Sequence, residues 1–106
     1  MSLRLSVHDN MATKIFAKTI GVAGYKGCRF SYNALIKAQR LQHLGHVIFV
    51  DDSGMFTSQD EYKVWLRENS VRFGPEASRH KTAPFVFRDE MFIGGCNDFF
   101  EWIDEQ

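Results

Sequence analysis

The apolar and polar positions in the first half of the chain predict a strand, a helix and a second strand. The apolar run 14–17 is typical of a short strand and leads into a loop, 18–27, with three glycines. A helix is expected from about Cys28 to Leu44, with Gly45 as its C-terminal stop. The continuous apolar run 46–50 then suits a strand buried on both faces. The helix prediction rests on apolar residues at helical spacing, namely Tyr32, Leu35, Ile36 and Leu41.

The second half predicts a helix, a hairpin and a last helix. Thr57 or Ser58 can cap a helix with Tyr62, Trp65 and Leu66 on one face. Segment 70–82 is a polar, locally basic loop broken by Gly74-Pro75, and the runs 84–87 and 90–93 read as strands joined at Arg88-Asp89. A final helix from Asn97 to about Glu105, capped by Asn97 or Asp98, has a broad apolar surface that we interpret as core. The predicted order is βαβαββα.

The first three elements form a βαβ unit. A right-handed crossover makes its two strands parallel and places the loop before Cys28 at their carboxyl ends. Sheets of this kind bind ligands at that edge. The sequence therefore predicts a site around Cys28.

Length and composition limit the class of protein. The chain has 106 residues, of which 44% are hydrophobic, which suits one domain with residues 1–13 as a loose N-terminal extension. Its 13 basic and 13 acidic residues balance, so neither nucleic acid nor a membrane is an expected partner. Two cysteines, with no signal peptide and no apolar run of membrane-spanning length, favour a reducing, cytoplasmic setting.

Cys28 is the candidate nucleophile because it falls where the glycine-rich loop gives way to the helix. Backbone N–H groups and the helix dipole stabilise an anion at that point, and Lys18, Lys26 and Arg29 add positive charge. The thiolate, which is the nucleophilic form, should therefore be favoured. The alternative is that Cys28 is a small apolar residue packed under the helix.

Three motifs in order resemble the glutaredoxin form of the thioredoxin fold. Cys28-Arg29-Phe30-Ser31 resembles the Cys-x-x-Ser active site of its monothiol members, and Thr82-Ala83-Pro84 resembles the segment with a cis proline. The run 92–98, Phe-Ile-Gly-Gly-Cys-Asn-Asp, resembles the diglycine turn that binds glutathione. The resemblance implies an α/β domain with a four-stranded mixed sheet flanked by helices.

The resemblance also implies a site and an activity. Cys28 would attack the mixed disulfide of a glutathionylated protein, and Ser31 cannot serve as a resolving thiol. Glutathione would be the co-substrate, and glutathionylated or disulfide-bonded proteins would be the partners of a monomer. The implied glutathione-binding residues are Lys18 together with Lys26 or Arg79 for the glycyl carboxylate, Arg29 and Phe30 beside the thiol, Thr82, Ala83 and Pro84 for the cysteinyl backbone, Gly94 and Gly95 at the turn, and Cys96, Asn97 and Asp98 for the γ-glutamyl end.

Other functions and assignments remain open at this point. Two subunits could use Cys28 and two glutathiones to hold a [2Fe-2S] cluster, although the chain lacks the Trp-Pro pair of the cluster-binding members. The fold could also be a redox-inert binding module. Pro84 could be a trans edge-strand proline, and Cys96 could be either a reactive thiol or a packed small residue. The four histidines show no metal-ligand spacing with the cysteines, so no other metal site is expected.

Overall fold

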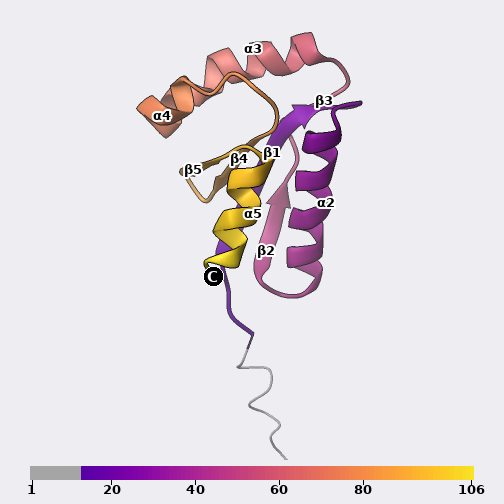
Figure 1. Cartoon of the computed structure of the whole chain (residues 1–106), viewed down its shortest axis with the longest axis vertical. Helices are drawn as coiled ribbons and strands as arrows, with labels where there is room; N and C mark the ends of the chain where they lie inside the picture. The colour runs from indigo at the N-terminus through magenta and orange to yellow at the C-terminus, as the bar shows by residue number, and fades with distance from the viewer. Residues whose placement is uncertain (1–12) are drawn as a thin grey trace, which may run out of the picture.

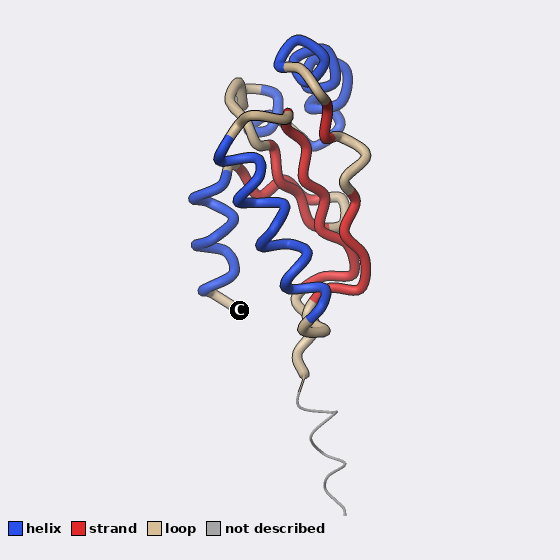
Figure 2. Tube along the Cα trace, turned by 90° about the vertical axis from the view of Figure 1, so that its right-hand side faces the viewer, coloured by secondary structure: helices blue, strands red, loops and turns tan. Residues whose placement is uncertain are grey.

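The computed structural model describes residues 13–106, in which helices cover both faces of a β-sheet (Figures 1 and 2). The extension expected at 1–13 lies, apart from Thr13, outside the described residues. The strands are β1 (Ala17–Tyr25), β2 (Val47–Asp51), β3 (Met55–Phe56), β4 (Phe85–Arg88) and β5 (Met91–Gly94). The helices are α2 (Arg29–His43), α3 (Gln59–Asn69), α4 (Pro75–Ser78) and α5 (Cys96–Asp104), with a 3-10 turn η1 (Ser70–Phe73).

The sheet has the predicted mixed topology. Its strand order is β2-β1-β4-β5, with β1 parallel to β2 and antiparallel to β4, and with β4 antiparallel to β5. The short strand β3, which the sequence pattern did not predict, pairs in parallel with Gly24 and Tyr25 at the end of β1. The predicted α/β arrangement is therefore confirmed, with one small strand added.

The predicted glycine-rich loop is wrong, because residues 18–25 belong to β1. The strand predicted at 14–17 is also misplaced, since only Ala17 of that run lies in β1. Gly21 and Gly24 are not flexible joints in this strand. A methyl group at Gly21 would overlap the ring of Phe87 on β4, and one at Gly24 would overlap the Ser31 side chain on α2. Glycine is needed at both positions for close packing rather than for a turn.

The prediction that 46–50 forms a strand buried on both faces is also wrong. β2 lies at the edge of the sheet, and it is covered by α2 on one side. Val47 and Val50 are buried, whereas Ile48 and Phe49 are 62% and 56% exposed. An apolar run alone did not distinguish an edge strand from a central one.

Each face of the sheet has its own apolar cluster and its own pair of helices. α2 and α5 pack on one face over Ile20, Val22 and Val86, and Figure 2 shows these two helices side by side. α3 and α4 cover the other face over Ala23, Phe85 and Phe87. The chain therefore has a three-layer α/β/α arrangement.

The helix ends follow the predicted caps with small differences. Ser58 caps α3 as expected, since its hydroxyl accepts from the Glu61 N–H and the Glu61 carboxylate accepts from the Ser58 N–H. α5 begins one residue early, and Asp98 reaches back to the Gly95 N–H. The predicted hairpin is confirmed, but its turn lies at 89–90 and Asp89 has a φ of 50°. In residues 13–106 no helix is both long and apolar enough to cross a bilayer.

Candidate functional site

Cys28 occupies the N-cap position of α2, directly after the end of β1. Its N–H donates to the Tyr25 carbonyl oxygen at 3.2 Å, and its own carbonyl oxygen accepts from the Tyr32 N–H at 3.0 Å. The side chain is half-buried and the thiol is free. The strand-to-helix turn thus holds the sulfur at the start of the helix, where unpaired N–H groups point outward.

The surroundings of Cys28 favour its thiolate. Burial alone raises the pKa of the Cys28 thiol, but hydrogen bonds from the Ser31 hydroxyl and the Ser31 and Phe30 N–H groups outweigh that effect. The Tyr25 hydroxyl is a further donor to the sulfur, so the pKa of Cys28 lies below its ordinary value. These donors, rather than the lysines and arginine named by the sequence, produce the shift.

The Ser31 hydroxyl is available to stabilise the Cys28 thiolate, because it is not engaged elsewhere among the described residues. The Ser31 side chain is fully buried where α2 packs against β1, in the space left by the missing side chain of Gly24. Within residues 13–106 its Oγ has no partner in full hydrogen-bond geometry, the Cys28 sulfur included. A buried hydroxyl without a partner is costly, and ionised Cys28 provides an acceptor for it.

The Thr82-Ala83-Pro84 segment faces Cys28, and the Ala83-Pro84 peptide bond is cis as predicted. Two side chains fix the segment from behind. The Tyr62 hydroxyl donates to the Thr82 carbonyl oxygen at 2.6 Å, and His80 Nε2 donates to the Pro84 carbonyl oxygen at 2.9 Å. Burial, followed by the charge of Cys28, raises the pKa of Tyr62, so its hydroxyl remains a donor.

Cys28 and this segment line a cavity of about 260 Å³. Tyr25 and Phe30 form the wall beside the sulfur, and Thr82 and Ala83 form the opposite wall. α3 closes the third side with Gln59, Tyr62 and Lys63, and Lys81 lies at the rim. The cavity therefore combines a thiolate, an exposed peptide segment and two cations.

Several predicted glutathione ligands do not reach this cavity. Lys18 lies at the start of β1, seven residues before Tyr25, which is about 23 Å along a strand. Lys26 lines a separate apolar hollow, and Arg29 and Arg79 are exposed residues outside the cavity lining. Lys18 was predicted near Cys28 because residues 18–27 were expected to form a loop, which could fold back to the site. In the extended strand β1, Lys18 lies far from Cys28.

The diglycine turn lies against the proline segment. Gly94 has a φ of +139°, and a methyl group at Gly95 would lie 3.8 Å from the Pro84 carbonyl oxygen. Asn97 and Asp98 are exposed at the start of α5. The Asp98 carboxylate accepts from the Gly95 N–H at 3.1 Å, so it already serves its own helix.

Cys96 is a core residue rather than a second surface thiol. It is 7% exposed and packs in the same apolar cluster as Ile20 and Phe99. Burial, and then the charge of Cys28, raises the pKa of its thiol. This agrees with the packed-residue alternative for Cys96.

The sequence did not identify Tyr25, Tyr62, Lys63 or Lys81 as site residues. Tyr62 was predicted only as part of an apolar helix face, and Lys63 is the next residue on that helix. Tyr25 carries a signal that could have found it, because it lies three residues before Cys28 where strand meets helix. The others come together only through the packing of α3 against the proline segment.

One solved structure supplies a comparison for this geometry. The chain is similar to the crystal structure of glutaredoxin 1 from Francisella tularensis complexed with cacodylate, with a TM-score of 0.57 and 16% sequence identity. The match covers 82% of this chain and 93% of that chain. The chain has a glutaredoxin-like thioredoxin fold. No family model matches it, and no curated protein sequence matches it, so the likeness lies in the fold.

Proposed function

We propose that this glutaredoxin-like chain is a monothiol, glutathione-dependent thiol-disulfide oxidoreductase that acts through Cys28. The observation that carries the proposal is the half-buried Cys28 sulfur at the N-cap of α2, whose pKa lies below its ordinary value and which opens into the cavity beside Ala83. A cytoplasmic setting, where thiols stay reduced, suits the two free cysteines.

The reaction needs no group beyond glutathione. The Cys28 thiolate attacks the glutathione sulfur of a protein mixed disulfide, forming a Cys28–glutathione disulfide and releasing the protein thiolate, which takes a proton. A second glutathione, as its thiolate, attacks that disulfide and leaves as oxidised glutathione, returning Cys28 to its thiolate. The balance is one mixed disulfide and one glutathione consumed, and one protein thiol and one oxidised glutathione formed.

Residues around the cavity supply the binding. The Ala83 backbone would pair with the cysteinyl part of glutathione like a neighbouring strand. Lys63 and Lys81 replace Lys18, Lys26 and Arg79 as the cations for the glycyl carboxylate, because they line the cavity. Gly94, Gly95 and Asn97 remain the proposed contacts of the γ-glutamyl end.

The cluster alternative fits one chain poorly. A [2Fe-2S] cluster takes four thiolates, and one chain supplies Cys28 alone because Cys96 is buried, so a cluster would need a second chain and two glutathiones. Among residues 13–106 no group of three or more His, Cys, Asp or Glu could hold a metal ion. We therefore derive no step through a cluster.

The proposal is tested by a glutathione-recycling assay on a glutathionylated peptide and on an intramolecular protein disulfide. Wild type should reduce the peptide and act poorly on the protein disulfide, Cys28→Ser should be inactive, and Cys96→Ser should resemble wild type. Ser31→Cys should gain protein-disulfide activity, because it places a second thiol one helical turn from Cys28. An inactive, colourless wild type would favour the binding module, and a brown protein would favour the cluster.

A further inference from the structure

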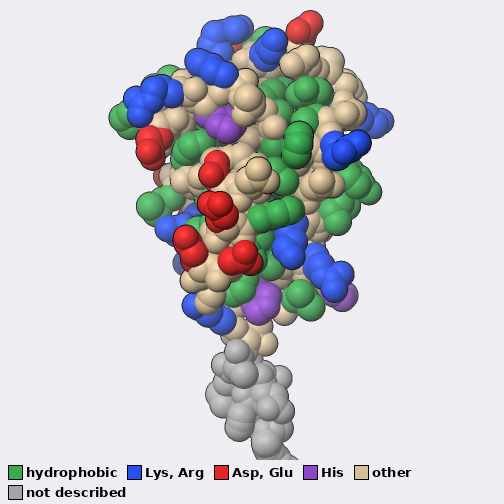
Figure 3. Space-filling model, in the orientation of Figure 1, with side chains coloured by type: hydrophobic (Ala, Val, Ile, Leu, Met, Phe, Trp, Pro, Cys, Tyr) green, Lys and Arg blue, Asp and Glu red, His purple; other side chains and the backbone are tan. Residues whose placement is uncertain are grey.

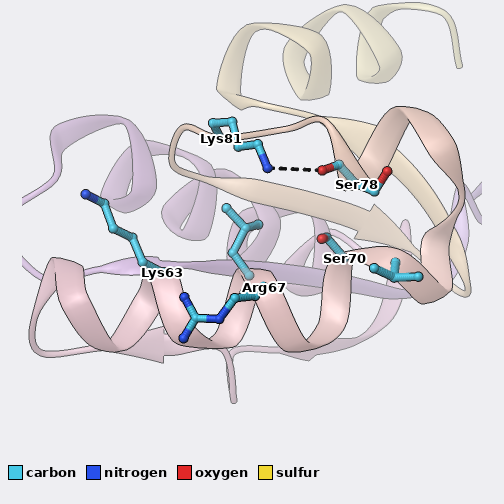
Figure 4. Close-up of a pocket in the computed structure, with 7 residues that line it drawn as sticks. Lys63, Arg67, Ser70, Ser78 and Lys81 are labelled. Carbon is cyan, nitrogen blue, oxygen red and sulfur yellow. Dashed lines mark hydrogen bonds between the residues drawn. The ribbon is translucent and has the colours of Figure 1, made fainter.

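A second, larger hollow adjoins the Cys28 cavity. It has a volume of about 500 Å³ and lies between α3 and the segment that leads from α4 to Lys81 (Figure 4). Lys63 and Lys81 line both hollows, so the two share a wall. A chain bound at Cys28 can therefore extend into the larger hollow without leaving the surface.

The larger hollow is cationic and carries no compensating carboxylate in its lining. Lys63 and Arg67 come from successive turns of α3, and Lys81 lies across from them with its ammonium 3.4 Å from the Ser78 carbonyl oxygen. Ser70 and Ser78 contribute polar atoms, and the remaining lining is apolar. Figure 3 shows Lys and Arg side chains gathered over α3 and α4. A chain of zero net charge thus concentrates positive charge at this place.

We propose that this hollow binds acidic side chains of the protein that carries the mixed disulfide. The inference rests on the proposed function and names its substrate class, namely glutathionylated cysteines with Asp or Glu nearby in the sequence. In the mixed disulfide, glutathione takes the Ala83 backbone together with Lys63 and Lys81, so the attached peptide lies beside it. On one side of its cysteine the peptide then passes the larger hollow, where its side chains would meet Arg67. Acidic residues on that one side of the cysteine should matter, and those on the other side should not.

Substitution of Arg67 tests the charge of the larger hollow separately from the Cys28 cavity. Arg67 lines the larger hollow and is absent from the lining of the Cys28 cavity, whereas Lys63 and Lys81 line both. Arg67→Gln therefore removes charge from the hollow alone. The matched control is Arg40→Gln on α2, which removes an exposed arginine from another part of the molecule.

The experiment compares kcat/KM for glutathionylated peptides with two Glu before the cysteine, two Glu after it, or Gln at the same positions. We expect one Glu peptide to exceed its Gln counterpart by about two- to fivefold, as for an exposed charge pair. The preference should disappear at about 1 M salt, where screening reaches ~3 Å. Arg67→Gln should abolish it and Arg40→Gln should keep it, while the mixed disulfide of glutathione and 2-mercaptoethanol, whose added group is uncharged, should react equally with all three proteins.

The outcomes separate the two proposals. If small and peptide disulfides are reduced but Glu and Gln peptides react alike, or if Arg67→Gln retains the preference, the acidic-substrate inference is overturned and the proposed function stands. If no disulfide is reduced, the proposed function fails and the inference falls with it. Arg67→Glu gives an independent check, because its carboxylate should repel the acidic peptide and lower kcat/KM for the favoured Glu peptide at least to the value of Arg67→Gln.

Discussion

Cys28 depends on side-chain and backbone donors that come from two elements. The Phe30 and Ser31 N–H groups and the Ser31 hydroxyl belong to α2, whereas Tyr25 belongs to β1. The effect of Tyr25 is reciprocal, because burial and then the Cys28 charge and hydrogen bond raise the pKa of the tyrosine. The two side chains therefore form one titrating unit.

Cys28 should react with iodoacetamide at pH about 6 much faster than Cys96. The hydrogen bonds that lower the pKa of Cys28 increase its thiolate fraction, whereas burial raises the pKa of Cys96 and blocks access. The measurement is the alkylation rate of each cysteine by mass spectrometry. Equal rates, or a faster Cys96, would remove the basis for the nucleophile assignment.

Tyr25→Phe should slow alkylation of Cys28 at pH about 6 by roughly fivefold. One hydrogen bond to the thiolate contributes about 1 kcal/mol, and the variant keeps the ring that packs against Tyr62. Tyr32→Phe is the matched control, because Tyr32 is 63% exposed on α2. If the two variants react alike, Tyr25 has no part in stabilising the thiolate.

The sequence predicted the site only where residues are close together in the chain. Cys28, Ser31 and the start of α2 could be found from local spacing, and so could Thr82-Ala83-Pro84. Lys18 could not be excluded, because its distance from Cys28 depends on whether 18–25 is a loop or a strand. Lys63 and Lys81 could not be found, because only the packing of α3 brings them to the same rim.

At the scale of elements, α3 is the support of the proline segment. Its capping box at Ser58 and its buried residues Tyr62 and Leu66 fix it on the sheet. The same helix then supplies the hydroxyl that holds the Thr82 carbonyl oxygen. The position of the peptide-binding segment is thus set by a helix that does not carry the thiol.

Tyr62→Phe should raise the KM for glutathione by about fivefold, while leaving the Cys28 alkylation rate unchanged. The variant removes one hydrogen bond, which is worth about 1 kcal/mol, from the segment that would pair with glutathione. It is the converse of Tyr25→Phe, which should change alkylation and leave KM unchanged. A slower alkylation in Tyr62→Phe would show that the helix acts on Cys28 itself.

Gly24→Ala should destabilise the protein by about 1–3 kcal/mol, the usual cost of forcing extra atoms into a packed core. The new methyl group would overlap the Ser31 side chain, so α2 must move at its first turn. The measurements are the free energy of unfolding in urea and the alkylation rate of Cys28, and both values should decrease.

The matched test for Gly24→Ala is the double variant Gly24→Ala, Ser31→Gly. It exchanges the two side chains across the same contact and removes the overlap. Stability should recover to within about 1 kcal/mol of wild type, the cost of a glycine in a helix. A double variant less stable than Gly24→Ala would mean that the contact does not limit the approach of β1 and α2.

The same contact explains why one strand was mistaken for a loop. Glycines usually mark turns, and β1 has glycines at 21 and 24. Here each one faces a bulky or buried neighbour from another element, which the local sequence does not reveal. The helices α2, α3 and α5 and the hairpin were predicted correctly because their caps and periodicity are local. The loop predicted at 70–82 is wrong in part, because η1 and the short helix α4 lie within it.

For the whole molecule, thiolate formation should be linked to folding stability. The pKa of Cys28 is lower in the fold than in the unfolded chain, so its contribution is absent below the folded pKa and grows as pH rises through it. It is complete above the ordinary thiol value of about 9. Wild type should therefore gain stability relative to Cys28→Ser as pH rises from the folded pKa of Cys28 to about 9.

The measurement is urea unfolding of both proteins across this pH range. Cys96→Ser is the control below about pH 8, where the unfolded thiol is still mostly protonated and where burial, which raises the pKa of Cys96, keeps the folded thiol protonated. Its difference from wild type should not change with pH. A constant difference for Cys28→Ser as well would show that the fold does not favour the thiolate.

The charge distribution in Figure 3 has a consequence for how the molecule meets a partner. Asp and Glu side chains follow α5, which has no Lys or Arg, while Lys63, Arg67 and Lys81 meet at the hollow beside α3. A neutral molecule with its charges separated in this way has an electric dipole moment. An approaching acidic protein is then turned toward the cationic end before contact, so orientation, rather than overall attraction, limits the rate of productive encounters.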